Sequence, residues 1–407
     1  MQPNKLRFKD PRYRDDPWAV FTEFREQGTI IPIKIPFVGK SWAATTYESV
    51  NRVFKDEQAF ARDPVTVGRK TFSYIQHFLP TVFSSLTNNM LSKDGVDHRR
   101  MRAVVDQAFA RRNIEGMSDR IGQLAAEQLD AVEGVIECDG TVDLIEHFSR
   151  PFPLTVICEL LGMPRDDRKQ FTKWFKPMTE MSGFMTVFKL GGGLRKMSSY
   201  LKRQFEIVRR ETRDGLMSEL VREEYDGQKL TESELLAMVF LLFVAGHETT
   251  VHLINNCVLT LMQHPDAKRE LTDDWSKVDV AIDEVLRYCS PLQMGKPRFV
   301  IQDMDFFGRS MKRGEMITPL IASANYDPAK FSDPRQFQIG RQPNHHMSFG
   351  SGPHTCLGMK LARTEVLHAL RELYERFQDL KPAFDLAHPD WSNRPGTRGL
   401  KTLLVTA

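Results

Sequence analysis

A single cysteine stands in a glycine-rich segment in the last quarter of the sequence. The ten residues from Phe349 to Gly358 are Phe-Gly-Ser-Gly-Pro-His-Thr-Cys-Leu-Gly. Glycines there allow tight turns and let another group come close, because they carry no side chain. An amphipathic helix is expected directly after Cys356, and backbone amides near a helix start favour a thiolate. One thiolate held in this way suits a single axial bond to iron, and a buried structural cysteine is the alternative interpretation.

This segment resembles the haem-binding loop of the cytochrome P-450 superfamily, in which Phe-x-x-Gly-x-x-x-Cys-x-Gly surrounds the axial cysteine. Each fixed position of that pattern is filled here. The resemblance implies that Cys356 is the axial ligand of the iron of haem b. It also implies that Phe349, Gly350 and Gly358 lie against the haem.

A second polar motif interrupts an apolar stretch at residues 245–250, Ala-Gly-His-Glu-Thr-Thr. A carboxylate and hydroxyls inside an apolar helix cost stability unless they have partners or a task. The motif resembles the family's helix across the distal face of the haem, which places Ala245 beside the cofactor. The resemblance implies that Gly246 leaves room for dioxygen, that Thr249 hydrogen-bonds to a water there, and that Glu248 supplies protons. A helix kink or a satisfied polar cluster is the alternative.

Glu284 and Arg287 lie three residues apart, on one face of an expected helix. The pair resembles the family's Glu-x-x-Arg, which implies a buried structural role near the cysteine loop. In the family, the Glu-x-x-Arg pair is bound to a downstream segment with the spacing Phe-x-x-x-Arg. Phe337 and Arg341 match that spacing here. The sequence departs from the pattern at Tyr326, where many soluble members carry arginine, so that arginine's role must be filled otherwise.

Four cationic positions suit the two haem propionates, because carboxylates in a closed pocket need paired donors. His98 and Arg102 lie four residues apart on one helix face, Arg298 follows the Glu-x-x-Arg helix at the family spacing, and His354 precedes the cysteine by two. The resemblance implies that all four bind propionates. For each residue alone, an ordinary surface charge is the alternative.

Basic residues also follow the cysteine and lie on the helix that carries His98. They are expected to form a proximal patch that docks an acidic ferredoxin or flavodoxin, and solvated helix charge is the alternative. The residues of this expected docking patch are Arg100, Arg111, Lys360 and Arg363.

The composition excludes several classes of protein. The 407 residues have a formal net charge of 56 − 53 = +3, so neither a nucleic-acid-binding tail nor a polybasic anchor is indicated. The five cysteines form no CxxC pair, which argues against a disulfide framework or a zinc site. The first ten residues hold no apolar stretch, and the apolar run at 238–246 is too short to span a bilayer. We expect a soluble, cytoplasmic, monomeric enzyme of bacterial type.

The sequence predicts a mainly helical fold with small β-sheets, an α+β class, in one cytochrome P-450 domain covering residues 1–407. A hairpin is expected at residues 30–45, where two apolar runs flank a turn. The glycine run at 191–193 predicts a loop between helices.

Three long helices are expected in the second half of the sequence. Thr231 and Glu234 form a capping box that opens an apolar helix, and proline ends that helix near residue 265. A second helix is expected at about 277–290, and short strands follow it. The third helix begins after Cys356 and carries an apolar stripe.

The resemblance implies a haem-thiolate monooxygenase that inserts one oxygen atom from O2 into an apolar organic substrate, by hydroxylation, epoxidation or oxidative dealkylation. Electrons would come from NAD(P)H through a separate ferredoxin or flavodoxin. The alternatives are a peroxide-driven peroxygenase, in which Arg-Pro typically replaces the acid–alcohol pair, a non-catalytic haem-thiolate sensor, and an enzyme that uses Cys356 as nucleophile. Segments rich in Phe, Met and Leu are expected to line the substrate pocket, at residues 72–91, 178–190, 241–246 and 292–297.

Overall fold

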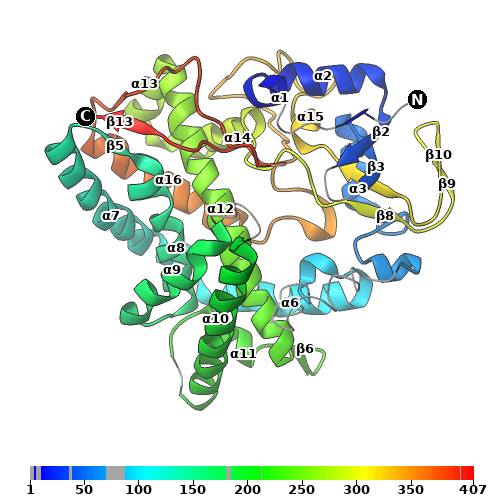
Figure 1. The fold of residues 1–407 in the computed structure, drawn as a ribbon, viewed down its shortest axis with the longest axis horizontal. Helices are drawn as coiled ribbons and strands as arrows, with labels where there is room; N and C mark the ends of the chain where they lie inside the picture. Colours follow the sequence, from blue (N-terminus) through cyan, green and yellow to red (C-terminus); the bar gives the residue numbers. More distant parts are fainter. Residues whose placement is uncertain are drawn as a thin grey trace. The chain divides into compact units, whose positions relative to one another are not determined.

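The computed structural model describes residues 4–5, 11–35, 39–69, 88–179, 185–211, 213–394 and 396–407. The chain forms two compact units. The first comprises Met1–Arg69, Ala125–Ser149 and Thr249–Ala407, and the second comprises Lys70–Leu124 and Arg150–Glu248. Helices predominate and the sheets are small (Figure 1), which confirms the predicted fold class. A single domain over residues 1–407 stays a prediction.

The second unit is built mainly from helices. Its described elements are η2 (Met90–Ser92), α6 (Gly95–Arg112), η3 (Ile114–Met117), α8 (Pro151–Leu161), α9 (Arg165–Thr179), α10 (Met185–Arg210), α11 (Leu216–Arg222) and the antiparallel hairpin of β6 (Glu224–Tyr225) and β7 (Gln228–Lys229). Helix α8 starts with a proline and stops at Gly162, whose φ of 74° lies in the left-handed region. Proline suits the first turn of a helix and glycine suits the residue that ends it.

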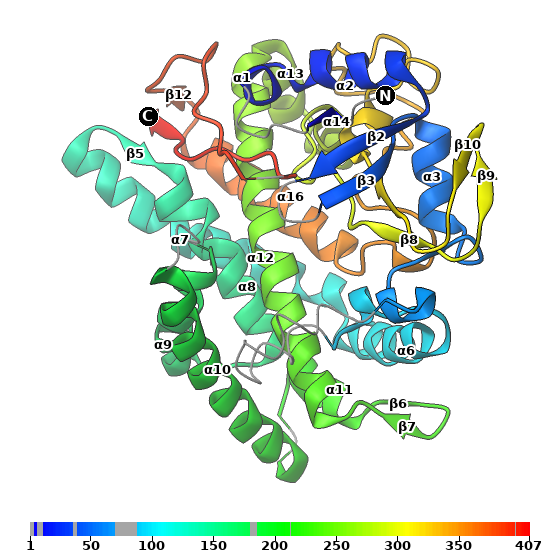
Figure 2. The same ribbon diagram turned by 45° about the vertical axis from the view of Figure 1, so that its right-hand side comes forward.

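Two long helices belong to both units, α7 (Ser118–Asp139) and α12 (Glu232–Gln263). Figures 1 and 2 show α12 as one continuous helix. The backbone N–H of Thr231 donates to the Glu234 carboxylate at 2.8 Å, and that of Glu234 donates to Thr231 Oγ1 at 3.3 Å. These bonds confirm the predicted capping box, and the helix ends at Gln263, which confirms the predicted end before Pro265. Among the described helices, α12 is the one with the length and apolarity of a membrane span, but most of its apolar window is buried, as in a core helix.

A six-stranded sheet organises the first unit. Its order is β1 (Asn4–Lys5), β2 (Ile30–Ile35), β3 (Gly39–Ala44), β11 (Met316–Pro319), β8 (Arg298–Val300) and β4 (Phe60–Ala61). The β1–β2 and β3–β11 pairs are parallel and the others are antiparallel. Strands β2 and β3 form the predicted hairpin, and its connection at 36–38 lies outside the described residues.

Helices cover both faces of this sheet. Helices α1 (Pro11–Asp15) and α2 (Pro17–Gln27) pack against Ile31 on one face, and α3 (Tyr47–Lys55) packs against Ile30 on the other. Successive strand residues point to opposite faces, so neighbouring isoleucines enter different clusters. This packing fixes the position of α3, which supports the cysteine loop.

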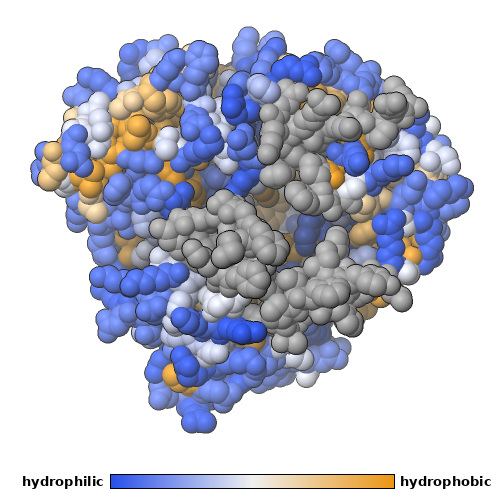
Figure 3. Space-filling model, viewed as in Figure 1, coloured by the Kyte–Doolittle hydropathy of each residue, from blue (hydrophilic) through white to orange (hydrophobic). Residues whose placement is uncertain are grey.

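The remaining elements of the first unit include a small three-stranded sheet, β12–β13–β5. They are η1 (Pro64–Val67), β5 (Val142–Asp143), the π-helical η4 (Ile145–Ser149), α13 (Pro265–Asp273), η5 (Trp275–Lys277), α14 (Val278–Tyr288), β9 (Met304–Phe306), β10 (Arg309–Met311), α15 (Ile321–Asn325), η6 (Gly352–His354), α16 (Met359–Arg376), β12 (Lys381–Pro382) and β13 (Leu404–Thr406). Helices α14 and α16 confirm the second and third predicted helices. Figure 3 shows a largely hydrophilic face on which hydrophobic residues gather where Figure 1 places β13, whose Leu404 is exposed.

The loop predicted at residues 191–193 is wrong, because these glycines lie inside α10. A Cβ on Gly193 would lie 2.7 Å from the carbonyl oxygen of Trp174 in α9, so close helix packing accounts for this glycine. Much of the expected pocket wall, at 72–87 and 180–184, lies outside the described residues.

Candidate active site

The cysteine loop belongs to the first unit and is folded by its own backbone. Gly350 and Gly352 have φ angles of 69° and 73°, which favour glycine. The N–H of Cys356 donates to the Phe349 carbonyl at 2.9 Å and closes the loop. Cys356 is exposed and lies three residues before the start of α16. This geometry presents a sulfur atom near the amino end of a helix, where a thiolate is favoured.

Helix α3 supports the loop from behind. A Cβ on Gly352 would lie 2.8 Å from the Phe54 carbonyl oxygen, so only glycine fits this contact. The Ser351 hydroxyl lies 2.9 Å from the side-chain oxygen of Asn51. The position of Cys356 therefore depends on α3 as well as on the motif itself.

The other cysteines differ from Cys356 in their surroundings. Cys158, Cys257 and Cys289 are buried, and burial raises the pKa of each thiol, that of Cys158 to about 12. They are therefore protonated and inaccessible at neutral pH. Cys138 is exposed but lies near the end of α7 rather than at the start of a helix. Among the described residues, no cluster of three or more His, Cys, Asp or Glu side chains could hold a metal ion.

Arg298 lies beside the same part of α3. It belongs to β8, is 1% exposed, and donates from Nη2 to the Phe54 carbonyl at 3.3 Å. Its guanidinium carbon lies 5.8 Å from the centre of the Phe54 ring. His354 lies in η6 within the loop and is buried. The first unit thus brings Arg298, His354 and Cys356 to elements that meet at the carboxyl end of α3.

His98 and Arg102 lie one turn apart on α6 in the second unit, as their spacing predicts. His98 is buried, and Arg102 Nε is 3.0 Å from a carboxylate oxygen of Asp106. Imidazole and guanidinium donors of this kind suit a carboxylate ligand.

The polar motif of α12 spans the end of the second unit and the start of the first. Ala245 is exposed, while Gly246, Glu248 and Thr249 are half-buried, in a helix whose other apolar residues are mostly buried. The neighbouring Val244 is 43% exposed. An accessible apolar face in the middle of a core helix suits contact with an apolar guest or a flat cofactor.

Helix packing explains one residue of this motif. A Cβ on Gly246 would lie 3.1 Å from Ile157 Cδ1 of α8, so the glycine lets α8 approach. His247 Nε2 lies 2.9 Å from the Arg150 carbonyl oxygen, next to the start of α8. Room for dioxygen at Gly246 stays a prediction.

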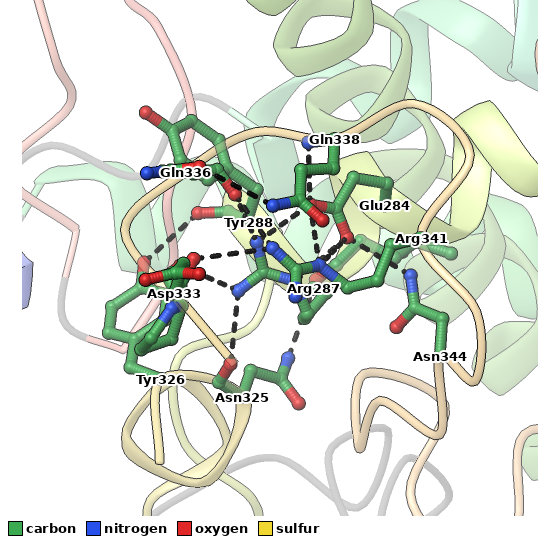
Figure 4. A network of polar contacts seen from close by, with 12 residues as sticks. Glu284, Arg287, Tyr288, Asn325, Tyr326, Asp333, Gln336, Gln338, Arg341 and Asn344 are labelled. Carbon is green, nitrogen blue, oxygen red and sulfur yellow. Dashed lines mark hydrogen bonds and ion pairs between the residues drawn. The ribbon is translucent and has the colours of Figure 1, made fainter. Parts of the chain in front are cut away.

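Glu284, Arg287 and Arg341 form a buried network in the first unit (Figure 4). The Glu284 carboxylate accepts from Arg287 Nε and Nη2, both at 2.8 Å, and from Arg341 Nε at 3.1 Å. Gln338 and Asn344 each donate one further hydrogen bond to it. Arg287 also donates to three backbone carbonyls at residues 325, 334 and 336. The network therefore binds α14 to the segment that leads into the cysteine loop.

Tyr326, where the family pattern led us to expect an arginine, lies in an aromatic stack. The Tyr326 ring stacks on Trp18 with centroids 3.3 Å apart, and its hydroxyl donates to the Tyr288 carbonyl at 3.2 Å. Burial raises the pKa of Tyr326, so the phenol stays neutral. Arg287 lies 5.8 Å from the Trp18 ring, which joins this stack to the buried network.

A second cluster, which sequence reasoning missed, holds Phe349 in place. Asp283 Oδ1 lies 2.5 Å from Arg363 Nη2 and 3.1 Å from His346 Nε2. Burial alone would raise the pKa of Asp283, but the His346 hydrogen bond and the charges of both partners outweigh it, and the pKa is lowered. The Arg363 guanidinium lies 5.5 Å from the Phe349 ring. The only signal was that Asp283 precedes Glu284 and that His346 precedes Phe349 by three.

The residues of the expected docking patch are mostly engaged in ion pairs. Arg100 pairs with Glu234, Arg111 Nε is 2.7 Å from Glu223, and Arg363 pairs with Asp283 as described. Lys360 and Arg111 are exposed, whereas the side chains of Arg100 and Arg363 are 15% and 25% exposed. The structure therefore gives the four residues different environments, and the docking patch stays a prediction.

Comparison with known proteins identifies the family of the chain. Residues 194–385 match the family model described as "Cytochrome P450". The polyketide biosynthesis cytochrome P450 PksS of Bacillus subtilis is 36% identical over 397 residues, which cover 97% of this chain and 96% of PksS. The monooxygenase PikC of Streptomyces venezuelae is 34% identical and covers 96% of this chain and 91% of its own. The structure of myxobacterial CYP267B1 in complex with myristic acid has a TM-score of 0.86, with 34% identity and 98% of both chains covered. This agreement over nearly the whole length shows that the chain belongs to the cytochrome P450 family and is a haem-thiolate monooxygenase.

Proposed function

We propose that Cys356 is the axial ligand of haem b and that the enzyme inserts one oxygen atom from O2 into an apolar organic substrate. The observation that carries this assignment is the exposed sulfur of Cys356 at the start of α16, in a loop turned by two positive-φ glycines, while three other cysteines are buried. When bound, haem supplies dioxygen activation and oxygen transfer, and the protein supplies position and polarity.

The residues present fit such a group. The fully buried guanidinium of Arg298 suits a carboxylate partner, because a buried charge is stabilised by a hydrogen-bonded counter-charge. We infer that Arg298 and His354 of the first unit, with His98 and Arg102 of the second, bind the propionates. Phe349, Gly350, Gly358 and Ala245 would lie against the ring.

Glu248 and Thr249 would deliver protons to the site. They are adjacent on α12, and both keep some solvent-accessible surface. The Glu248 carboxylate can take a proton from bulk water and pass it to a water molecule held by the Thr249 hydroxyl. This acid–alcohol pair argues against the peroxide-driven alternative, in which no proton path is needed.

The substrate is inferred to be apolar. Val244 and Ala245 present accessible apolar surface on α12. One relative is named for polyketide biosynthesis and one similar structure holds myristic acid, which agrees with an elongated, mostly apolar guest. We also propose that the enzyme acts in the cytoplasm as a single-domain monomer. Its electrons would come from NAD(P)H through a ferredoxin or flavodoxin, with exposed Lys360 and Arg111 as the docking charges that the structure leaves most accessible.

The test is the absorption of the reduced protein under carbon monoxide. The wild-type protein should show the band that gives the family its name, and Cys356→Ser should lose it. Cys138→Ser is the matched control, because it removes another exposed cysteine, and it should keep the band. A wild-type band at the position of histidine-ligated haem, or a normal band in Cys356→Ser, would contradict thiolate ligation.

A further inference from the structure

A cavity of about 400 Å³ lies within the second unit, where α6 ends and α7 begins. Its charged lining residues are Arg112, the last residue of α6, Arg120 in the first turn of α7, Glu159 in the last turn of α8, and Asp214, two residues before α11. None of these four residues is among the inferred haem ligands or the proton-delivering pair. The cavity is therefore a candidate site for a further ligand.

Close backbone contacts fix the walls of this cavity. A Cβ on Gly215 would lie 2.6 Å from the Cα of Gly162, the residue that ends α8, so the chain crosses the end of this helix with only backbone between the two. The N–H of Gly116 donates to Asn113 Oδ1 at 3.3 Å, and a Cβ on Gly116 would lie 2.8 Å from Asn113 Nδ2. The packed backbone thus holds the cavity, and Asp214 next to Gly215, in place.

The guanidinium of Arg112 lines the cavity and uses only one of its three nitrogens. Nη1 donates to both carboxylate oxygens of Asp214, at 2.9 and 3.0 Å. Nε is buried, and neither Nε nor Nη2 has a hydrogen-bond partner among the described residues. The Nε–Nη2 side of a guanidinium is a fork that fits two oxygens of one carboxylate or phosphate. Because a buried donor without an acceptor costs stability, an anion that reaches this fork should bind there.

Positive charge is in excess around the cavity. The Glu159 carboxylate is shared between Arg168 Nη1 at 2.7 Å and Arg120 Nε at 3.5 Å. Burial alone would raise the pKa of Glu159, but the hydrogen bonds and charges of both arginines outweigh it, and the pKa is lowered. The Asp214 side chain is 84% exposed, so water weakens its attraction to Arg112. Three guanidiniums accompany two carboxylates, which leaves 3 − 2 = +1 for a ligand to balance.

We propose that this cavity binds the carboxylate or phosphate group of a small organic anion, with the Nε–Nη2 fork of Arg112 as its anchor. A water molecule takes up about 30 Å³ of liquid, so a cavity of about 400 Å³ holds more than a bare oxyanion. The ligand therefore carries an organic part, for which the buried Met117 supplies an apolar wall. Binding there is additional to the proposed oxygen transfer and does not require haem.

The experiment is isothermal titration calorimetry of the haem-loaded protein at constant ionic strength. The probes are glycerol 3-phosphate, glycerate and glycerol, which share a carbon chain and differ in their charged group. Wild type is compared with Arg112→Met, Arg112→Lys, Asp214→Asn and Arg209→Met. Arg209→Met is the matched control, because Arg209 of α10 pairs with Glu206 on the surface of the same unit. The reduced carbon monoxide band and circular dichroism check that each variant is folded.

Wild type should bind at least one of the two anions at a single site and should not bind glycerol. Arg112→Met should weaken that anion about tenfold or more, and Arg112→Lys should also weaken it, because lysine keeps the charge but lacks the fork. Asp214→Asn should strengthen it by about two- to fivefold, since it removes one exposed negative charge beside the fork. Arg209→Met should bind as wild type does.

The probes also identify the source of the anionic group. Tighter binding of glycerol 3-phosphate indicates a phosphate ligand, and tighter binding of glycerate indicates a carboxylate. If neither anion binds below about 10 mM, or if Arg112→Met binds as wild type does, the proposal is wrong. An equal loss in Arg209→Met, or weaker binding in Asp214→Asn, would likewise overturn it. If Arg112→Met does not fold, Arg112→Lys and Asp214→Asn decide the question, because their expected effects have opposite signs.

Discussion

Glu284→Gln tests the buried network most directly. Each carboxylate oxygen of Glu284 accepts at least one hydrogen bond from Arg287 and one from Arg341, and all three side chains are buried. Glutamine keeps the shape of the side chain but removes the negative charge. It also turns one acceptor into a donor that faces other donors.

The expected loss of unfolding free energy follows from the two guanidinium groups, of Arg287 and Arg341, that the substitution leaves without a carboxylate. Breaking a buried ion pair by removing one partner costs about 3–5 kcal/mol. Domains of ordinary stability have a free energy of unfolding of about 5–15 kcal/mol, so the loss is a large fraction of that free energy. The matched control is Glu375→Gln, because Glu375 pairs with Arg371 on the surface of α16 with both side chains about half exposed. An exposed i, i+4 pair of this kind contributes only about 0.3–0.5 kcal/mol.

The assay is urea unfolding of the haem-loaded variants, followed by tryptophan fluorescence and by the haem absorption band. Glu284→Gln should shift the midpoint strongly or fail to accumulate under conditions in which Glu375→Gln folds normally. If Glu284→Gln lowered the free energy of unfolding by less than about 1 kcal/mol, or by no more than Glu375→Gln does, the fold would not need the charge of Glu284 and the reasoning would be refuted.

Three further predictions concern single residues. Thr249→Ala should keep substrate binding but divert reducing equivalents to peroxide, as measured by product and peroxide formed per NAD(P)H; undiminished coupling would exclude the proton role. Gly352→Ala should lower thermal stability and haem retention more than Gly308→Ala. Both glycines have a φ of 73°, but a Cβ on Gly352 would lie 2.8 Å from the Phe54 carbonyl oxygen, whereas a Cβ on Gly308 would have no neighbour within 4 Å. Equal effects of the two substitutions would show that the contact at Gly352 relaxes. Burial raises the pKa of Glu365 well above its ordinary value of 4.5. The neutral carboxyl of Glu365 therefore contributes its full stability below pH 4.5, and this contribution is lost as the pH rises through the pKa of the folded state. Glu365→Gln should therefore gain stability relative to wild type between pH 4 and pH 8 in denaturant titrations, and a constant difference across this range would count against a neutral buried carboxyl.

Short sequence patterns predicted those helices whose ends and buried faces depend on neighbouring residues. The capping box at Thr231, the proline after Gln263 and the apolar stripe after Cys356 act within a few residues, and the structure has helices with these bounds. The sheet order could not be predicted in the same way. Strand β3 pairs with β11 although Trp42 and Ile317 are far apart in sequence, and such pairing is decided by packing.

The candidate site was predictable to the extent that its residues form motifs. Cys356, Glu284 and Arg287 stand at recognisable spacings, and the structure places them as an exposed thiol and a buried pair. Asp283 and His346 carry no motif, and their contact joins α14 to the residues before the loop. Only a structure shows that Arg363 packs against Phe349 rather than standing free on the surface.

Helix α3 shows why motif residues alone do not define this site. It contributes no group with catalytic chemistry, yet the Phe54 carbonyl accepts a hydrogen bond from Arg298 and leaves no space for a side chain at Gly352. Because α3 is fixed by its packing against the six-stranded sheet, it holds the inferred thiolate loop and the inferred propionate donor in one frame. A substitution that shifts α3 should therefore move Cys356 and Arg298 together, whereas one confined to the loop should move Cys356 alone. The distance between the sulfur and the guanidinium is thus set by the core on which α3 packs.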